Sequence, residues 1–108
     1  MVRTYKLNDV KIIANSNFHF EDNILYDKKY TKIIAALPTG LYGNLTIKEG
    51  IKEIQDYAFS YCHLLTSVIF PSTLTKIGDS SFRLSGLRSI IFNKNIETIE
   101  DYAFYNCS

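Results

Sequence analysis

The sequence predicts a repeat solenoid, mainly β in character, in which coils of similar length stack on one another. A pattern of apolar or aromatic residues at offsets 0, 3 and 5 starts at residues 7, 42, 65 and 87. A second pattern, with apolar residues at offsets 0, 3 and 8, starts at residues 51, 74 and 96. The first pattern recurs at intervals of 35, 23 and 22 residues. Self-similarity at about 20–29 residues is the signature of such a solenoid.

The first pattern predicts one parallel strand in each coil. In the third copy the side chains of Val68 and Phe70 would point into the coil and those of Ser67 and Ile69 outward, because strand residues alternate between two faces. Past three of the four strands, at offset 8, a short polar side chain is expected to bond to the backbone of a neighbouring turn; these residues are Asn15, Thr73 and Asn95. The predicted ladder strands are residues 7–12, 42–47, 65–70 and 87–92.

The second pattern predicts the return of each coil along its convex side. Its spacing also fits the apolar stripe of a helix, but a unit of 22–23 residues leaves little room for a full helix after the strand. We expect an extended piece through residues 51–54, followed by one or two turns of 3-10 or α-helix around residues 57–60. The Phe residues at offset 8 should stack as a column inside the coils; they are Phe59, Phe82 and Phe104.

The first unit is longer than the others, and its additional residues predict a β-meander at about residues 17–37. Polar breaks at residues 21–23 and 27–29 are typical of hairpin turns between short apolar strands. We expect this meander to replace the convex return of its unit.

The repeats account for nearly the whole chain, so residues 1–108 are expected to form a single domain. The predicted units are residues 7–41, 42–64, 65–86 and 87–108. Solenoids need caps that hide the core and the edge strands, and neither end carries an obvious one. A fragment of a longer array is therefore expected, and its uncapped ends could self-associate.

The composition argues against several classes of function. The net charge is +1, and the 12 basic and 11 acidic residues are scattered, so no nucleic-acid partner is predicted. Apolar runs are far shorter than the roughly 18–20 residues of a membrane span, and no signal peptide is recognisable. No recognisable motif places a nucleophile with His19 or His63, and no phosphate-binding loop occurs. The sequence therefore predicts no enzyme activity, no cofactor and no membrane insertion in this segment.

The two cysteines occupy the same position in the repeat, two units apart. Adjacent strands lie about 4.8 Å apart, so the Cα atoms of Cys62 and Cys107 should be about 10 Å apart. A disulfide requires less than about 7 Å. We expect two small buried thiols rather than a bridge, and no metal site, because no further ligands accompany them.

The outward-facing residues of the ladder strands predict a ligand-binding surface on the concave side of the solenoid. Ile69 and Ile91 would lie side by side with Pro71, forming an apolar spot edged by polar groups, as is common at protein contacts. The alternative is that solenoid strands simply tolerate an exposed isoleucine. The candidate residues are Lys11, Thr46, Lys48, Ser67, Ile69, Pro71, Ser89, Ile91 and Asn93.

Residues 45–82, LTIKEGIKEIQDYAFSYCHLLTSVIFPSTLTKIGDSSF, resemble the BspA-like leucine-rich repeat family. The resemblance extends over about residues 7–108 and implies a leucine-rich repeat solenoid. Small departures are Ser81 and Ser85, where Ala and Cys are usual, and Asn93, where Pro is usual.

The same resemblance implies a non-enzymatic module that binds proteins. Several members of the family look like surface adhesins, so we expect a host or matrix protein as ligand and a location at the cell surface, or secreted, within a longer protein. The alternative is an intracellular scaffold or assembly subunit that stacks through its open ends.

Overall fold

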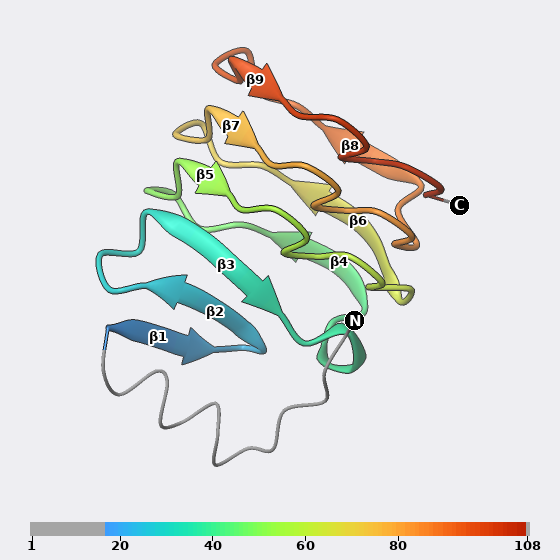
Figure 1. Cartoon of the computed structure of the whole chain (residues 1–108), viewed down its shortest axis with the longest axis horizontal. Helices are drawn as coiled ribbons and strands as arrows, with labels where there is room; N and C mark the ends of the chain where they lie inside the picture. Colours follow the sequence, from blue (N-terminus) through green and yellow to red (C-terminus); the bar gives the residue numbers. More distant parts are fainter. Residues whose placement is uncertain (1–16, 108) are drawn as a thin grey trace.

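The computed structural model describes residues 17–107, and these form a β-solenoid of about three turns with very little helix (Figure 1). The expected first ladder strand, residues 7–12, lies outside the described residues. The elements in chain order are β1 (Phe18–Glu21), β2 (Ile24–Asp27), β3 (Lys32–Ala36), the 3-10 helix η1 (Pro38–Gly40), β4 (Gly43–Thr46), β5 (Glu53–Ile54), β6 (Leu65–Ile69), β7 (Lys76–Ile77), β8 (Ser89–Ile91) and β9 (Thr98–Ile99).

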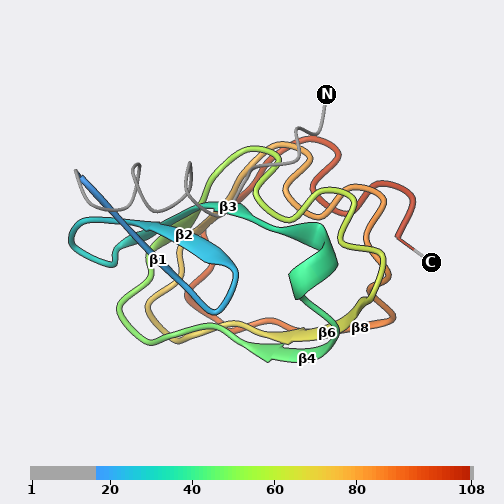
Figure 2. The same cartoon turned by 90° about the horizontal axis from the view of Figure 1, so that it is seen from below.

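Two parallel ladders run along the solenoid, and each later coil contributes one strand to each ladder. Strands β4, β6 and β8 form a three-stranded sheet, and β5, β7 and β9 extend a second sheet that starts from the meander. Figure 2 shows the coils overlapping as flattened rings, with β4, β6 and β8 on one side and β3 on the other. The strands β4, β6 and β8 lie within the predicted ladder strands at 42–47, 65–70 and 87–92, so those predictions are confirmed.

The meander predicted at residues 17–37 is present as the antiparallel strands β1, β2 and β3. Its third strand also pairs in parallel with β5, with Ile33 opposite Ile54. The meander therefore continues the second sheet instead of standing apart from it, and its strands cover the edge that β5 would otherwise expose.

The later coils return without a helix, contrary to the expected 3-10 or α-helical turns around residues 57–60. Within residues 17–107 the single helical element is η1, which precedes these coils. Residues 55–62 instead form consecutive hydrogen-bonded turns, in which Tyr57 and Tyr61 have φ values of 62° and 65°. A positive φ interrupts a right-handed helix and leaves alternate N–H groups free for the next coil. Bonds of 2.6–3.0 Å run from Tyr57 to Asp79, from Phe59 to Ser81 and from Tyr61 to Arg83.

The aromatic column predicted for the interior is confirmed. The ring centroids of Phe59 and Phe82 lie 4.8 Å apart, and those of Phe82 and Phe104 lie 5.5 Å apart, with nearly parallel planes in both pairs. Phe59 and Phe82 are fully buried. This column is the centre of a core to which both ladders contribute isoleucines and leucines.

The cysteines lie beside this column as free thiols. Cys62 is buried, and burial raises the pKa of its thiol to about 12. Cys107 is only half-buried, which differs from the expectation of two buried thiols. Ser85 lies in the coil between them, with its Oγ 3.4 Å from Cys107 Sγ. The Cys62 thiol is unsuited to nucleophilic chemistry, because burial disfavours its thiolate.

Candidate protein-binding face

The outward-facing side chains of β4, β6 and β8 form one surface, which we call the sheet face. The strands are in register, so equivalent side chains of successive coils line up in rows across the sheet. One row contains Ile69 and Ile91, which are 45% and 59% exposed and stand opposite one another on adjacent strands. The two rows are Asn44, Ser67 and Ser89, and Thr46, Ile69 and Ile91.

The sheet face is electrically neutral. None of the residues in β4, β6 and β8 carries a charge. In the polar row the Ser67 hydroxyl donates a hydrogen bond to Asn44 Oδ1. Hydroxyl and amide groups beside exposed isoleucines can form hydrogen bonds and apolar contacts with a protein, but the three strands supply no charged group to a phosphate or a metal ion.

Pro71 does not belong to this surface, contrary to the sequence prediction. It is buried at the end of β6, and its carbonyl accepts a hydrogen bond from the Asn93 side-chain amide. Asn93 is only half-exposed and also receives the N–H of Asn95 on its Oδ1, at 2.6 Å. Both residues join the turns of two coils, so the apolar spot consists of Ile69 and Ile91 alone.

Two of the polar residues expected to bond neighbouring turns, Thr73 and Asn95, do so, and the third, Asn15, lies outside the described residues. The Asn95 side-chain amide donates to the carbonyl of Ser72 at 2.9 Å. One coil earlier, the Thr73 hydroxyl donates to the carbonyl of Ile51 at 2.7 Å and accepts the N–H of Gly50 at 2.9 Å. These bonds fix the spacing of the coils at the edge of the sheet face.

Lys48, which the sequence places among the candidate residues of the concave side, turns toward the meander instead. Its ammonium pairs with the Glu21 carboxylate and lies 5.0 Å from the centroid of the Tyr30 ring and 5.4 Å from that of Tyr26. The Tyr30 hydroxyl donates to Glu21 at 3.2 Å. The hydrogen bond with Lys48 lowers the pKa of Glu21, and the same bond raises the pKa of Lys48. Lys48 therefore links the second coil to the meander. Lys11, another candidate residue of the concave side, lies outside the described residues.

One exposed aromatic residue was missed at the start of β4. The repeat pattern predicts that Tyr42 points inward, but its side chain is 76% exposed and Leu41 is buried instead. The register shifts between Gly43 and Asn44, and Gly43 has a φ of 74°, so the chain enters the strand differently from the later coils. Gly43, the first residue of the strand, was the signal in the sequence that could have indicated this shift.

A comparison with known families agrees with the stacked geometry. The family model for the BspA-type leucine-rich repeat region matches residues 39–108, with six copies. The chain belongs to the BspA-type leucine-rich repeat family. The searches for similar curated proteins and for similar solved structures found no match.

Membership in this family suggests a protein-binding repeat module with protein partners, because the fold is generally a non-enzymatic interaction fold. The BspA type is typically extracellular or associated with surfaces. Over residues 17–107, no helix is both long and apolar enough to cross a membrane. The same residues contain no group of three or more His, Cys, Asp or Glu side chains that could hold a metal ion.

Proposed function

We propose that this chain is a ligand-binding segment of a surface adhesin and that its sheet face contacts a host or matrix protein. The observation that carries the proposal is the pair Ile69 and Ile91, exposed side by side on adjacent strands. Large aliphatic groups in this position gain free energy only when a second surface removes them from water. We further propose that the chain is a single domain within a longer repeat array at the cell surface.

The surroundings of the two isoleucines favour a protein ligand. The row of Asn44, Ser67 and Ser89 supplies hydrogen-bonding groups next to the apolar pair, which is the usual composition of a protein contact. The absence of charge in the three strands makes the contact insensitive to salt. Thr46 continues the isoleucine row toward the meander.

Binding to a panel of purified matrix proteins tests this proposal, with Ile69→Glu and Ile91→Glu as the variants of the sheet face. Each should weaken binding by about tenfold or more, because a buried carboxylate without a partner opposes the contact. The matched control is Ile99→Glu, which makes the same change at an isoleucine of β9 in the other sheet that is 48% exposed. A ligand whose affinity is unchanged by both sheet-face variants would contradict the proposal.

A second candidate function, a scaffold that stacks through its ends, is favoured by the last coil. Phe92 and Ile99 are each 48% exposed, whereas their equivalents one coil earlier, Phe70 and Ile77, are 5% and 0% exposed. Another repeat coil placed against this surface would bury both side chains. Sedimentation equilibrium at increasing concentration tests this function: assembly that Ile99→Glu abolishes and Ile69→Glu leaves intact would support it. A monomer at all concentrations would contradict it.

A further inference from the structure

A second outward surface of the solenoid is formed by the turns that return each coil, and we call it the turn face. It comprises residues 55–62, 78–85 and 100–107. Successive turns are joined by hydrogen bonds of 2.6–3.0 Å from N–H groups of one coil to carbonyl groups of the next. The turns are thus held as rigidly as a sheet, and their side chains are presented in fixed rows.

Each coil contains two hydrogen-bonded turns whose third residue has a positive φ. Such a position favours Gly or Asn, because other side chains collide with the backbone there. Asn106 follows this preference, with a φ of 53°. Tyr57, Tyr61 and Tyr102 do not, although their φ values are 62°, 65° and 59°. The backbone does not explain why three tyrosines occupy these positions.

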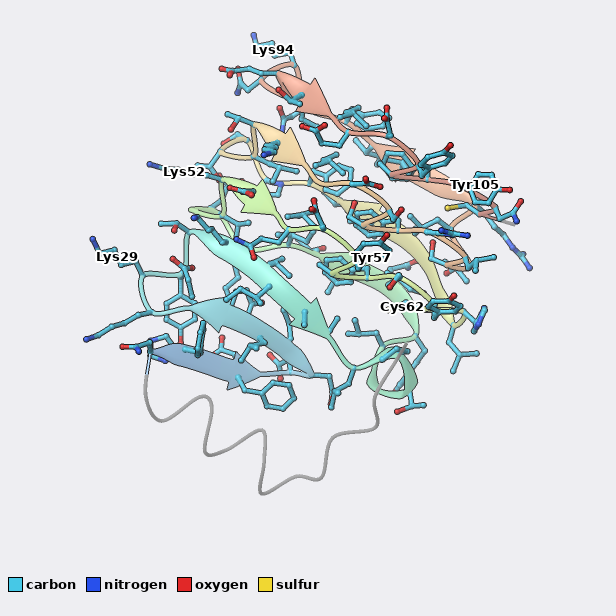
Figure 3. The ribbon with its side chains drawn as sticks, in the orientation of Figure 1. Lys29, Lys52, Tyr57, Cys62, Lys94 and Tyr105 are labelled. Atoms are coloured by element: carbon cyan, nitrogen blue, oxygen red, sulfur yellow. The ribbon has the colours of Figure 1, made fainter. Side chains whose placement is uncertain are left out.

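The exposure of these rings also argues against a role in the core. Tyr57, Tyr61 and Tyr102 are all exposed, as is Tyr105 nearby. The rings of Tyr102 and Tyr105 meet edge to face, with centroids 5.5 Å apart. In Figure 3, Tyr57 lies over the middle of the coils and Tyr105 on the side opposite the edge that carries Lys52 and Lys94. Exposed, rotationally restricted tyrosines are the residues on which many protein interfaces depend.

The charges of the turn face indicate what such a partner would present. The three segments contain four acidic residues and one basic residue, Arg83. The Arg83 guanidinium carbon lies 5.2 Å from the centroid of the Tyr105 ring. Arg83 and Tyr105 thus already form a cation–π contact on this surface, which is the kind of contact that a basic partner side chain would make. The acidic residues are Asp56, Asp79, Glu100 and Asp101, so each of the three coils places a carboxylate directly before its first positive-φ residue.

We propose that the turn face is a second binding surface, for a protein that presents arginine or lysine side chains. The cations of the partner would lie over the rings of Tyr57 and Tyr102, beside the carboxylates of Asp56 and Asp101. The middle coil has Ser80 in the same row, and this residue is buried with its hydroxyl donating to the Asp79 carboxylate at 2.8 Å, so Tyr57 and Tyr102 carry the exposed rings of the row. This surface is separate from the sheet face and binds by charge and aromatic contact, whereas the sheet face binds by apolar contact.

Nuclear magnetic resonance titration of the whole, isotopically labelled chain tests this inference. The probe is the blocked peptide acetyl-Gly-Arg-Ser-Arg-Gly-amide at low salt, and its control carries neutral citrulline in place of arginine. The arginine peptide should shift signals of residues 55–62 and 100–107, and the citrulline peptide should not. The double variant Tyr57→Asn, Tyr102→Asn should weaken binding at least about fivefold, because two cation–π contacts are lost. Tyr42→Asn, a change at an exposed tyrosine outside the turn face, should leave binding unchanged.

Thermal unfolding of the same variants separates a binding role from a structural one. Asn tolerates a positive φ better than Tyr, so the double variant should unfold at the same temperature as the parent chain or at a higher one. A clear fall in unfolding temperature would show that the rings serve stability and would overturn the inference. Equal binding of the citrulline peptide, or undiminished binding by the double variant, would also overturn it. Variants at Ile69 and Ile91 should have no effect on peptide binding. Failure of the turn-face inference can therefore be distinguished from failure of the sheet-face proposal.

Discussion

The third coil (residues 65–86) and the fourth (87–108) have similar side chains at equivalent positions, but the exposed fraction of these side chains differs between the two coils. Phe70, Ile77 and Phe82 of the third coil are buried, whereas Phe92 and Ile99 of the fourth are about half exposed. The third coil has a neighbour on both sides, and the fourth has one among the described residues. The repeat sequence therefore determines which side chain points inward, but the neighbouring coil determines how much free energy that side chain contributes to folding.

The largest effect is expected for Phe82→Ala, at the centre of the aromatic column. Phe82 stacks between Phe59 and Phe104 and is fully buried, so its removal should cost about 3–5 kcal/mol of unfolding free energy. Denaturant unfolding followed by circular dichroism measures this cost. A loss below about 1 kcal/mol would mean that the column does not hold the coils together.

A smaller effect is expected for Gly86→Ala, where the chain enters the fourth coil. A Cβ atom added there would lie 2.1 Å from the carbonyl oxygen of His63, so the coil would have to move. Overpacking of this kind typically costs about 1–3 kcal/mol. The same unfolding measurement applies, and an unchanged stability would show that the second and third coils, to which His63 and Gly86 belong, are not in close contact at this point.

Phe104→Ala is the direct counterpart of Phe82→Ala in the last coil. Its ring has the column on one side only and is half-buried, so we expect a cost of about 1–2 kcal/mol, well below that of Phe82→Ala. Equal costs for the two substitutions would refute the contrast between the coils. In that case another surface would have to cover the fourth coil in solution.

The smallest effect concerns the other end of the stack, where the meander covers the second coil. The Glu21–Lys48 pair is partly exposed, so a double-mutant cycle with Glu21→Gln and Lys48→Met should give a coupling of about 0.2–1 kcal/mol. Because the pKa of Glu21 is lowered, its contribution is complete above the ordinary value of 4.5 and is lost as the pH falls through the folded-state pKa. Because the pKa of Lys48 is raised, its contribution is complete below 10.5 and is lost at higher pH. A coupling that persists at pH 2 would contradict this assignment.

The rows of the solenoid could be predicted from the sequence because the repeat period sets the register. Phe59, Phe82 and Phe104 lie at one offset, and a constant coil length is sufficient to place them in one column. The turn conformation could not be predicted in this way. Positive φ is normally signalled by Gly or Asn, but here Tyr, Ser and Leu occupy most of those positions.

Single side chains of the candidate face were harder to predict than its rows. The alternation of side chains along the strand correctly predicts that Ile69 and Ile91 are exposed. It carries no information about the residues beyond the end of the strand. Pro71 is buried because the chain turns there, and Lys48 is drawn away by a carboxylate on a strand 27 residues earlier. Such contacts depend on the position of the meander, which the repeat pattern does not determine.

The most direct test of the stacked register is engineered disulfide formation across the sheet face. In a chain with Cys62→Ser and Cys107→Ser, cysteines are placed at Ile69 and Ile91, which are paired residues on adjacent strands about 4.8 Å apart. The control places them at Thr46 and Ile91, two strands and about 10 Å apart, beyond the reach of a disulfide. Mass spectrometry after mild oxidation should find an intramolecular bond in the first chain and free thiols in the second. Bond formation in the control, or none between positions 69 and 91, would contradict the stacking on which both proposed binding surfaces depend.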